Sequence, residues 1–147
     1  MCHPVLPFRV GDKASLSKTV TDKDIVSFAE LVGDYNPLHV DEEYARKGRF
    51  GGRVAHGALT IGLISAVLGS KIPGPSTIYL SQSIRFVRPA RPGDTITATV
   101  EVLEINAEKR VVRLRTDCVN QASKTVAEGE AVVLVDGGPR IFNNDKA

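Results

Sequence analysis

Two residue types that together can move protons lie five positions apart in the first third of the chain. Asp34 and His39 flank Asn36 and Pro37 within the stretch FAELVGDYNPLHVDEEYA, Phe28 to Ala45. Proline fixes its own φ near about −65° and disfavours the helical region for the residue before it, so the chain should bend here. A bend would bring a carboxylate and an imidazole to one water molecule, which one of them can deprotonate while the other delivers a proton.

The same residues also suit a structural role. Gly-Asp-x-Asn-Pro is the composition of an ordinary turn capped by Asx side chains, in which Asp34 would only accept backbone hydrogen bonds. His39 could equally be a structural or surface histidine. Spacing alone leaves the catalytic and the structural interpretation open.

The elements that must position these residues begin with a helix. Thr21 followed by Asp24 has the pattern of a capping box, in which side chains satisfy free N–H groups at a helix start. Gly33 should end this helix, which places Asp34 on a loop. Apolar residues at helical spacing predict one buried face, and they are Ile25, Phe28, Leu31 and Val32.

A second, more apolar helix is predicted from His56 to Ser70. Its residues are apolar on nearly all sides, which is typical of a helix that other elements wrap completely. The Pro73-Gly74-Pro75 run ends it. Between the two helices, Asp41 to Ala45 predicts a short helix, and a glycine-rich loop at residues 48–52 leads to Arg53.

The rest of the chain has the period-two pattern of antiparallel strands with one buried face. A short strand or hairpin is predicted for Phe8 to Val20, and longer strands for residues 76–87, 94–103, 110–120 and 125–135. One antiparallel sheet curled around one apolar helix would bury both, so the predicted class is α+β.

Composition narrows the function further. The 19 basic and 17 acidic residues give a net charge of +2, without the basic excess of a nucleic-acid-binding protein. Cys2 and Cys118 do not predict a disulfide scaffold, and neither a signal peptide nor a membrane span is evident. We expect a cytoplasmic protein, or one of the mitochondrial matrix if a presequence has been removed.

The run GDYNPLH, followed by AHGALTIGLIS and by PGPSTIYLSQSIRFVRPARPGDTI, resembles the MaoC-like, (R)-specific enoyl-CoA hydratases. The resemblance extends over roughly Val10 to Val135. It implies the hot-dog fold, with an antiparallel sheet wrapped around a long central helix. It also implies that residues 1–147 form one domain with a core at about residues 8–136.

The implied activity is that of a hydro-lyase, which adds water reversibly across the double bond of a 2-enoyl thioester to give an (R)-3-hydroxyacyl thioester. In this resemblance Asp34 and His39 are the catalytic pair, with their roles as acid and base left open. Asn36 would hold the loop, and Ser65 would support the histidine, although a small residue on a buried helix also suits simple packing.

The start of the second helix offers a further function. Free N–H groups and a partial positive charge lie at a helix N-terminus, so the Gly57 N–H is a sensible donor to the developing oxyanion of the thioester. His56 is assigned to the same substrate-binding end, and the favoured interpretation is a capping or buried, hydrogen-bonded histidine. Asp34, His39 and His56 could ligate a metal in principle, but the family pattern implies none. No cofactor is expected, because coenzyme A is part of the substrate.

Rival functions and partners follow from the same resemblance. A 3-hydroxyacyl-[acyl-carrier-protein] dehydratase, an acyl-CoA thioesterase of the same fold and a non-catalytic acyl-binding domain remain alternatives, and the substrate is an enoyl-CoA or an enoyl carrier protein. A homodimer is expected, with no nucleic-acid or membrane partner. Candidates for setting acyl length are Leu63, Val67, Ile72 and Leu80. Basic residues that could meet coenzyme A phosphates are Lys47, Arg53, Arg85, Arg88 and Arg91.

Overall fold

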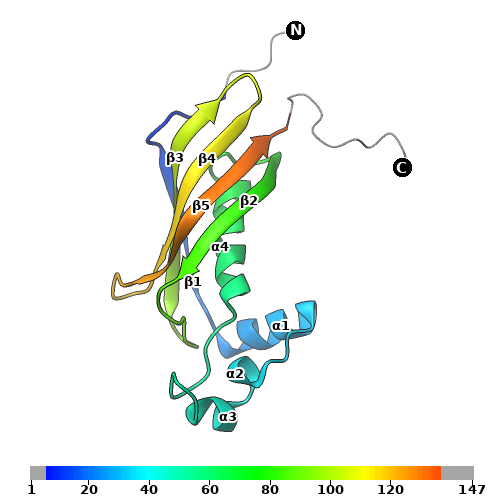
Figure 1. The fold of residues 1–147 in the computed structure, drawn as a ribbon, viewed down its shortest axis with the longest axis vertical. Coiled ribbons are helices and arrows are strands. Elements are labelled where there is room, and N and C mark those ends of the chain that lie inside the picture. The colour runs from blue at the N-terminus through cyan, green and yellow to red at the C-terminus, as the bar shows by residue number, and fades with distance from the viewer. Residues whose placement is uncertain (1–5, 137–147) are drawn as a thin grey trace, which may run out of the picture.

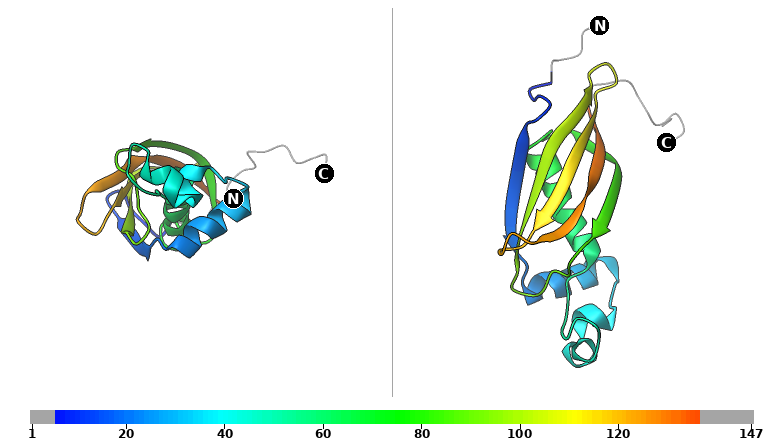
Figure 2. Two further views of the ribbon diagram at one scale, coloured as in Figure 1. Left: turned by 90° about the horizontal axis from the view of Figure 1, so that it is seen from below. Right: turned by 60° about the vertical axis from the view of Figure 1, so that its left-hand side comes forward.

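A five-stranded antiparallel sheet forms the main body of the protein. The computed structural model describes residues 6–136. The order of strands across the sheet is β1-β3-β4-β5-β2. The strands are β1 (Lys13–Thr19), β2 (Thr77–Phe86), β3 (Thr95–Asn106), β4 (Val111–Val119) and β5 (Thr125–Val135). The sheet curls around the helix α4 (Gly57–Ser70), as Figure 2 shows, and we call β1–β5 with α4 the sheet body.

Alternating side chains explain why these strands bury one face. On β3, Ile96, Ala98 and Val100 are fully buried, while the threonines between them are only partly covered. On β4, Val112 and Leu114 are likewise buried. Because successive residues of a strand point to opposite faces, this pattern places every second residue against α4. The predicted α+β class and the predicted strands are confirmed.

Three shorter helices hang from one end of the sheet body (Figure 1). They are α1 (Asp22–Val32), α2 (Pro37–Val40) and α3 (Glu42–Arg46). Residues 22–56, which contain them and the chain that returns to α4, are called the helical segment. The predicted capping box is present, because the Thr21 side chain accepts from the Asp24 N–H and the Asp24 carboxylate accepts from the Thr21 N–H. Gly33 ends α1 in the left-handed conformation, with φ 80°.

Two expectations about burial were wrong. Within one chain α4 is covered on one side only: Ile64, Val67 and Leu68 pack against the sheet, while its outer face, made by Ala58, Gly62, Ser65, Ala66 and Gly69, is exposed. A single curled sheet cannot reach around the helix. On α1, Ile25 is buried, but Leu31 and Val32 are 82% and 55% exposed because nothing within residues 6–136 covers the end of this helix.

Cys118 forms no disulfide within the residues that the structure describes. Cys118 is a free thiol on the buried face of β4. Burial, with Asp117 beside it, raises the pKa of the Cys118 thiol to about 12. Cys2 lies outside the described residues. Among residues 6–136 no helix is long and apolar enough to cross a membrane.

Candidate functional site

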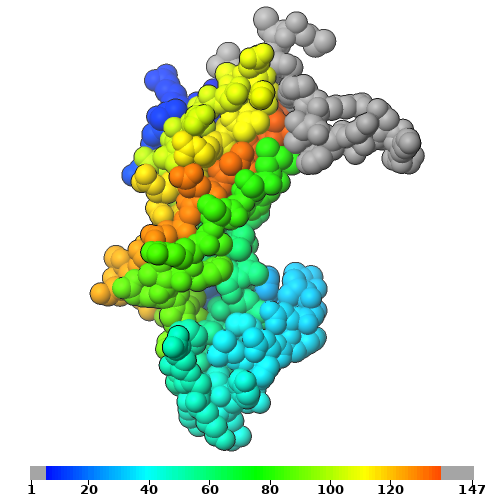
Figure 3. All heavy atoms as spheres, in the orientation of Figure 1, coloured from blue at the N-terminus to red at the C-terminus, as the bar shows by residue number. Residues whose placement is uncertain are grey.

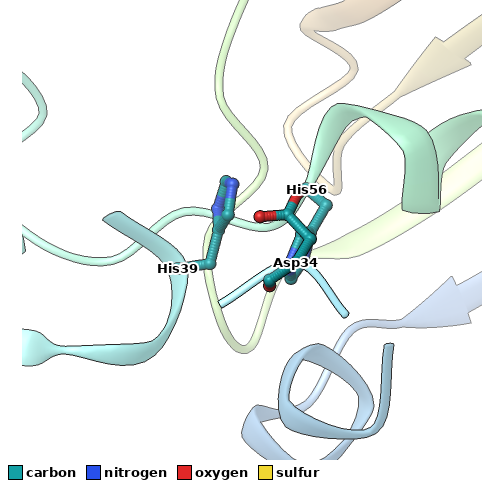
Figure 4. Close-up of side chains that lie close together, drawn as sticks. All are labelled: Asp34, His39 and His56. Carbon is teal, nitrogen blue, oxygen red and sulfur yellow. The ribbon is translucent and has the colours of Figure 1, made fainter. Parts of the chain in front are cut away.

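Three side chains from separate parts of the helical segment meet at the N-terminus of α4. Asp34 comes from the loop between α1 and α2, His39 from α2, and His56 from the residue before α4. Figure 4 shows the three side chains together, and one ligand atom of each lies within 4.8 Å of the others. In the space-filling view the helical segment forms a lobe below the sheet body (Figure 3). The bend predicted at Asn36-Pro37 therefore does bring Asp34 and His39 together.

Short local hydrogen bonds shape the loop that carries Asp34. The Asn36 N–H donates to the Asp34 carboxylate at 3.2 Å. The Asn36 side chain in turn accepts from the Leu38 N–H at 3.1 Å and so caps α2, whose first residue is Pro37. Asp34 is exposed. One carboxylate oxygen is thus engaged in the turn, and the group as a whole faces solvent.

His39 is held in one orientation by its Nδ1 atom. The side chain is 8% exposed, and Nδ1 lies 2.7 Å from the carbonyl oxygen of Val54. A carbonyl can only accept, so Nδ1 carries the hydrogen. In the neutral ring this leaves Nε2 as an acceptor with a free lone pair. His39 therefore presents a hydrogen-bond acceptor, and a group able to take a proton, to the site.

His56 touches both members of the pair. Its Nε2 donates to the backbone carbonyl of Asp34 at 3.1 Å. Its ring stacks on that of His39, with centroids 3.9 Å apart and an interplanar angle of 29°. The Phe28 ring lies against it at 4.8 Å. The residue is 2% exposed, and its Nδ1 is buried without a hydrogen-bond partner in the part of the chain that the structure describes.

The two structural interpretations of His56 have different outcomes. Its side chain makes no capping hydrogen bond to α4, so the capping interpretation was wrong. The Nε2 atom is engaged with Asp34 and therefore is not available to the helix N-terminus. The buried, hydrogen-bonded interpretation matches the structure.

Gly57 is the first residue of α4 and faces an aromatic ring. A Cβ atom added there would lie 2.8 Å from the nearest ring carbon of Phe86, closer than side chains approach one another. Gly57 and Phe86 also line a cavity of about 350 Å³, whose wall includes Arg88. A side chain at position 57 would therefore require the half-exposed Phe86 ring to shift.

The stacked histidines are poorly arranged for a shared metal ion. Asp34, His39 and His56 are a possible ligand group by distance. However, a ring nitrogen binds a metal along its lone pair, in the plane of the ring. Two nearly parallel rings 3.9 Å apart direct these lone pairs side by side and not to one point. The absence of a metal stays a prediction.

Ser65 is not joined to the histidines. It lies on the exposed outer face of α4, and none of the hydrogen bonds found within residues 6–136 connects it to His39 or His56. The rings instead donate hydrogen bonds to backbone carbonyls: His39 donates to Val54, and His56 donates to Asp34. Within one chain the structure therefore gives Ser65 no supporting contact.

Arg53 has a structural role that was not expected from the sequence. Its guanidinium group pairs with Asp22 of α1 and with Glu42 of α3, the latter at 3.0 Å, and it approaches the carbonyl of His39 at 3.5 Å. Burial lowers the pKa of Arg53, but the hydrogen bonds that its guanidinium donates to Asp22 and Glu42 outweigh this effect, and the net pKa is raised. Arg53 thus links all three short helices, and no local motif could have shown this.

Three of the other basic candidates also have protein partners. Arg85 pairs with Glu128 at 2.9 Å. Arg88 donates to the carbonyl of Thr125, and Arg91 to that of Phe50. Lys47 follows the end of α3 beside a shallow hollow. Arg88 is the one that lines the cavity beside Gly57.

Comparison with known proteins gives consistent matches. The MaoC like domain family model matches residues 10–127. An (R)-specific enoyl-CoA hydratase of Rhodospirillum rubrum is 52% identical over 133 residues, 90% of this chain and 92% of that protein. A 3-hydroxybutyryl-CoA dehydratase of Methylorubrum extorquens is 45% identical over 126 residues, 86% and 80% of the two chains.

A solved structure agrees with these matches. The (R)-hydratase from A. caviae involved in PHA biosynthesis superposes with a TM-score of 0.85 at 38% identity, covering 89% of this chain and 99% of that one. This match confirms the hot-dog fold expected from the sequence.

Proposed function

Because the chain belongs to the family of the MaoC like domain, we propose that it is an (R)-specific 2-enoyl-CoA hydratase, a hydro-lyase that gives (R)-3-hydroxyacyl-CoA. The observation that carries the proposal is the meeting of Asp34 with His39, whose Nε2 is free to accept a proton. The high similarity to a hydratase over nine-tenths of the chain supports the substrate class.

His39 is the base in this proposal. Its Nδ1–H is committed to the Val54 carbonyl, so the neutral ring can accept a proton only at Nε2. A water molecule held there loses a proton to Nε2 as its oxygen bonds to C3. The electrons of the double bond move toward the thioester carbonyl, and Nε2–H then returns one proton to C2. One water is consumed, and His39 ends as it began.

Asp34 orients that water. Its carboxylate is exposed and near the His39 ring, with the Asn36 N–H as its hydrogen-bond donor in the described chain. A carboxylate that accepts the second hydrogen of the water fixes the direction of the attacking lone pair. Asn36 contributes by holding the turn on which Asp34 lies.

The start of α4 supplies the electrostatic part of the site. Negative charge develops on the thioester oxygen as water adds to C3. The Gly57 N–H, at the first position of a 14-residue helix, is a donor of the kind that stabilises such an oxygen. The cavity bordered by Phe86 and Arg88 lies beside it.

The first test is a hydration assay. Purified protein is mixed with crotonyl-CoA, and loss of the conjugated enoyl thioester absorbance is followed beside an Asp34→Asn variant. We expect rapid loss with the wild type, a decrease of about 10²–10⁴-fold in the variant, and an (R)-3-hydroxy product on chiral analysis. Release of free thiol from saturated acyl-CoA would indicate a thioesterase. Activity only on an enoyl carrier protein would indicate the dehydratase alternative.

No cofactor is needed for this proposal, because the reaction moves protons and forms one C–O bond. Protein treated with a chelator and then desalted should therefore keep its full hydration rate. A rate that falls with the chelator and returns with an added metal ion would contradict the proposal of a metal-free site.

We also propose a homodimer. Large apolar side chains are exposed on one chain, among them Leu31 at 82% and Phe86 at 50%. The outer face of α4 carries only small residues, which allow close approach of a second helix. A second copy would cover these surfaces. Light scattering after size exclusion should give twice the monomer mass of 15.8 kDa, and a monomer at micromolar concentration would contradict the proposal.

A further inference from the structure

His56 is a buried residue whose side chain contacts both partners of the proposed catalytic pair. Its Nε2–H donates to the Asp34 carbonyl, and its ring stacks on the ring of His39 at an interplanar angle of 29°. It is also the last residue before the longest helix, and it is 2% exposed. Each of its contacts to the pair therefore starts from a fixed point of the fold.

The contact to His39 restricts a motion that the other hydrogen bond leaves free. The Nδ1–H···O bond to Val54 fixes the distance of one ring atom, but the ring plane can still tilt about that bond. A second ring at 3.9 Å opposes this tilt. The Phe28 ring lies against His56 and holds it in place. Phe28 of α1 packs at a tilted angle of 55° against His56, and His56 stacks on His39 of α2, so three aromatic rings connect α1, the start of α4 and α2.

The contact to Asp34 acts on the backbone. Asp34 belongs to an exposed loop, and its own side chain bonds only within the turn. The His56 Nε2–H is the link from that loop to the buried start of α4. Loss of this bond would allow the loop to move relative to His39, which changes the separation of the two groups that must share one water.

We propose that His56 is a positioning residue that sets the distance and angle between Asp34 and His39, and that it does not exchange a proton with substrate. This inference rests on the proposed hydratase function. Catalytic rates are sensitive to such geometry, and a displacement of about 1 Å can cost about 100-fold. The expected signature is a lower kcat with little change in KM.

Two variants separate the two contacts. His56→Phe keeps a ring against His39 but cannot donate to Asp34, whereas His56→Gln keeps an N–H donor but removes the ring. We expect each to lower kcat by about 10–100-fold, with KM changed less than about threefold. In a His39→Ala background neither should lower the residual rate further. Val112→Ala in β4, which is buried in the sheet body, is the matched control: it lowers stability but not kcat.

A measurement without substrate tests the positioning directly. The chain has three histidines, so long-range ¹H–¹⁵N spectra of histidine-labelled protein can be assigned with a His3→Gln variant. We expect His39 as the Nδ1–H tautomer and His56 as the Nε2–H tautomer. In His56→Gln the His39 ring signals should broaden, because the tilt of the ring about the Val54 bond is no longer opposed, while in His56→Phe they should stay close to the wild type.

The outcomes are distinct. Unchanged His39 signals in His56→Gln, or kcat within twofold of the wild type in both variants, would overturn the inference. An inactive wild type with the expected spectra would count against the hydratase function alone. If both variants fail to fold, Phe28→Leu removes the ring behind His56 and should move the His56 and His39 signals in the folded protein. Unmoved signals there would also overturn the inference.

Discussion

Every inward-facing residue of β3 from Ile96 to Val102 is at most 1% exposed, whereas Asp34 and most of its neighbours in the helical segment are exposed. The sheet body is stabilised by apolar burial that extends along whole strands. The helical segment buries only scattered apolar residues, such as Ile25 and Ala45, and polar contacts connect its parts: the Arg53 ion pairs, the His39–Val54 bond and the His56–Asp34 bond. Asp34 and His39 therefore lie in the helical segment, where a single hydrogen bond or ring contact can fix the orientation of a side chain. The sheet body supports that segment.

The largest effect should come from the helical segment and should leave stability almost unchanged. His39→Ala removes the proposed base, so hydration of crotonyl-CoA should slow by about 10²–10⁴-fold. The midpoint of thermal unfolding should move by only a few degrees, because the hydrogen bond to Val54 and the stack on His56 are lost while the sheet body keeps its contacts. A steady-state assay and a melting curve on the same sample test both statements. A His39→Ala variant that loses much stability but keeps its hydration rate would contradict the contrast between the helical segment and the sheet body.

A core substitution should show the reverse. Leu114 is fully buried on β4, so Leu114→Ala should lower the free energy of unfolding by about 2–5 kcal/mol. At 25 °C kcat should stay within about twofold of the wild type, provided that the protein is folded. Denaturant unfolding gives the first quantity, and the hydration assay the second. Equal damage to both would mean that the sheet body and the site are more tightly coupled than their contacts indicate.

Much of the sheet body could be predicted from the sequence, since a period-two apolar pattern and turn residues are local signals. The five strands, the capping box at Thr21 and the end of α1 at Gly33 all agree with the structure. The exposed face of α4 could not be predicted, because an apolar helix does not reveal how much of its cover belongs to the same chain. The stack of His56 on His39 was also missed, since it joins residues with no shared periodicity.

Removing the Arg53 ion pairs within the helical segment should have a smaller effect than the two substitutions above. Arg53→Met keeps most of the apolar stem of the side chain but removes the ion pairs to Asp22 and Glu42. Because the Asp22 and Glu42 side chains are exposed to solvent, each pair contributes only about 0.2–1 kcal/mol. We expect faster proteolysis within residues 22–56 and a kcat lowered about tenfold. Limited digestion and kinetics would reveal this, with Arg85→Met as a control, because its ion pair to Glu128 is largely exposed on the sheet.

The smallest effect concerns the start of α1. Thr21→Ala removes the acceptor of the Asp24 N–H and should cost about 1 kcal/mol. Backbone donation from Thr21 and the Lys18 ammonium lower the pKa of Asp24 below its ordinary 3.8. The stabilisation by this carboxylate is therefore complete above pH 3.8 and is lost as the pH falls through the lower, folded-state pKa. An Asp24→Asn variant should consequently lose less stability than the wild type on acidification in that range.

The contact between Gly57 and Phe86 has a consequence for the evolution and engineering of this chain. Since a methyl group at position 57 would lie 2.8 Å from the ring, the residues tolerated at one position depend on the residue at the other. Gly57→Ala should displace the Phe86 ring when made alone but not beside Phe86→Leu, which is epistasis with a steric origin. A library that varies these two positions one at a time would miss the combinations that reshape the cavity beside the start of α4. Varying them together would reach those combinations.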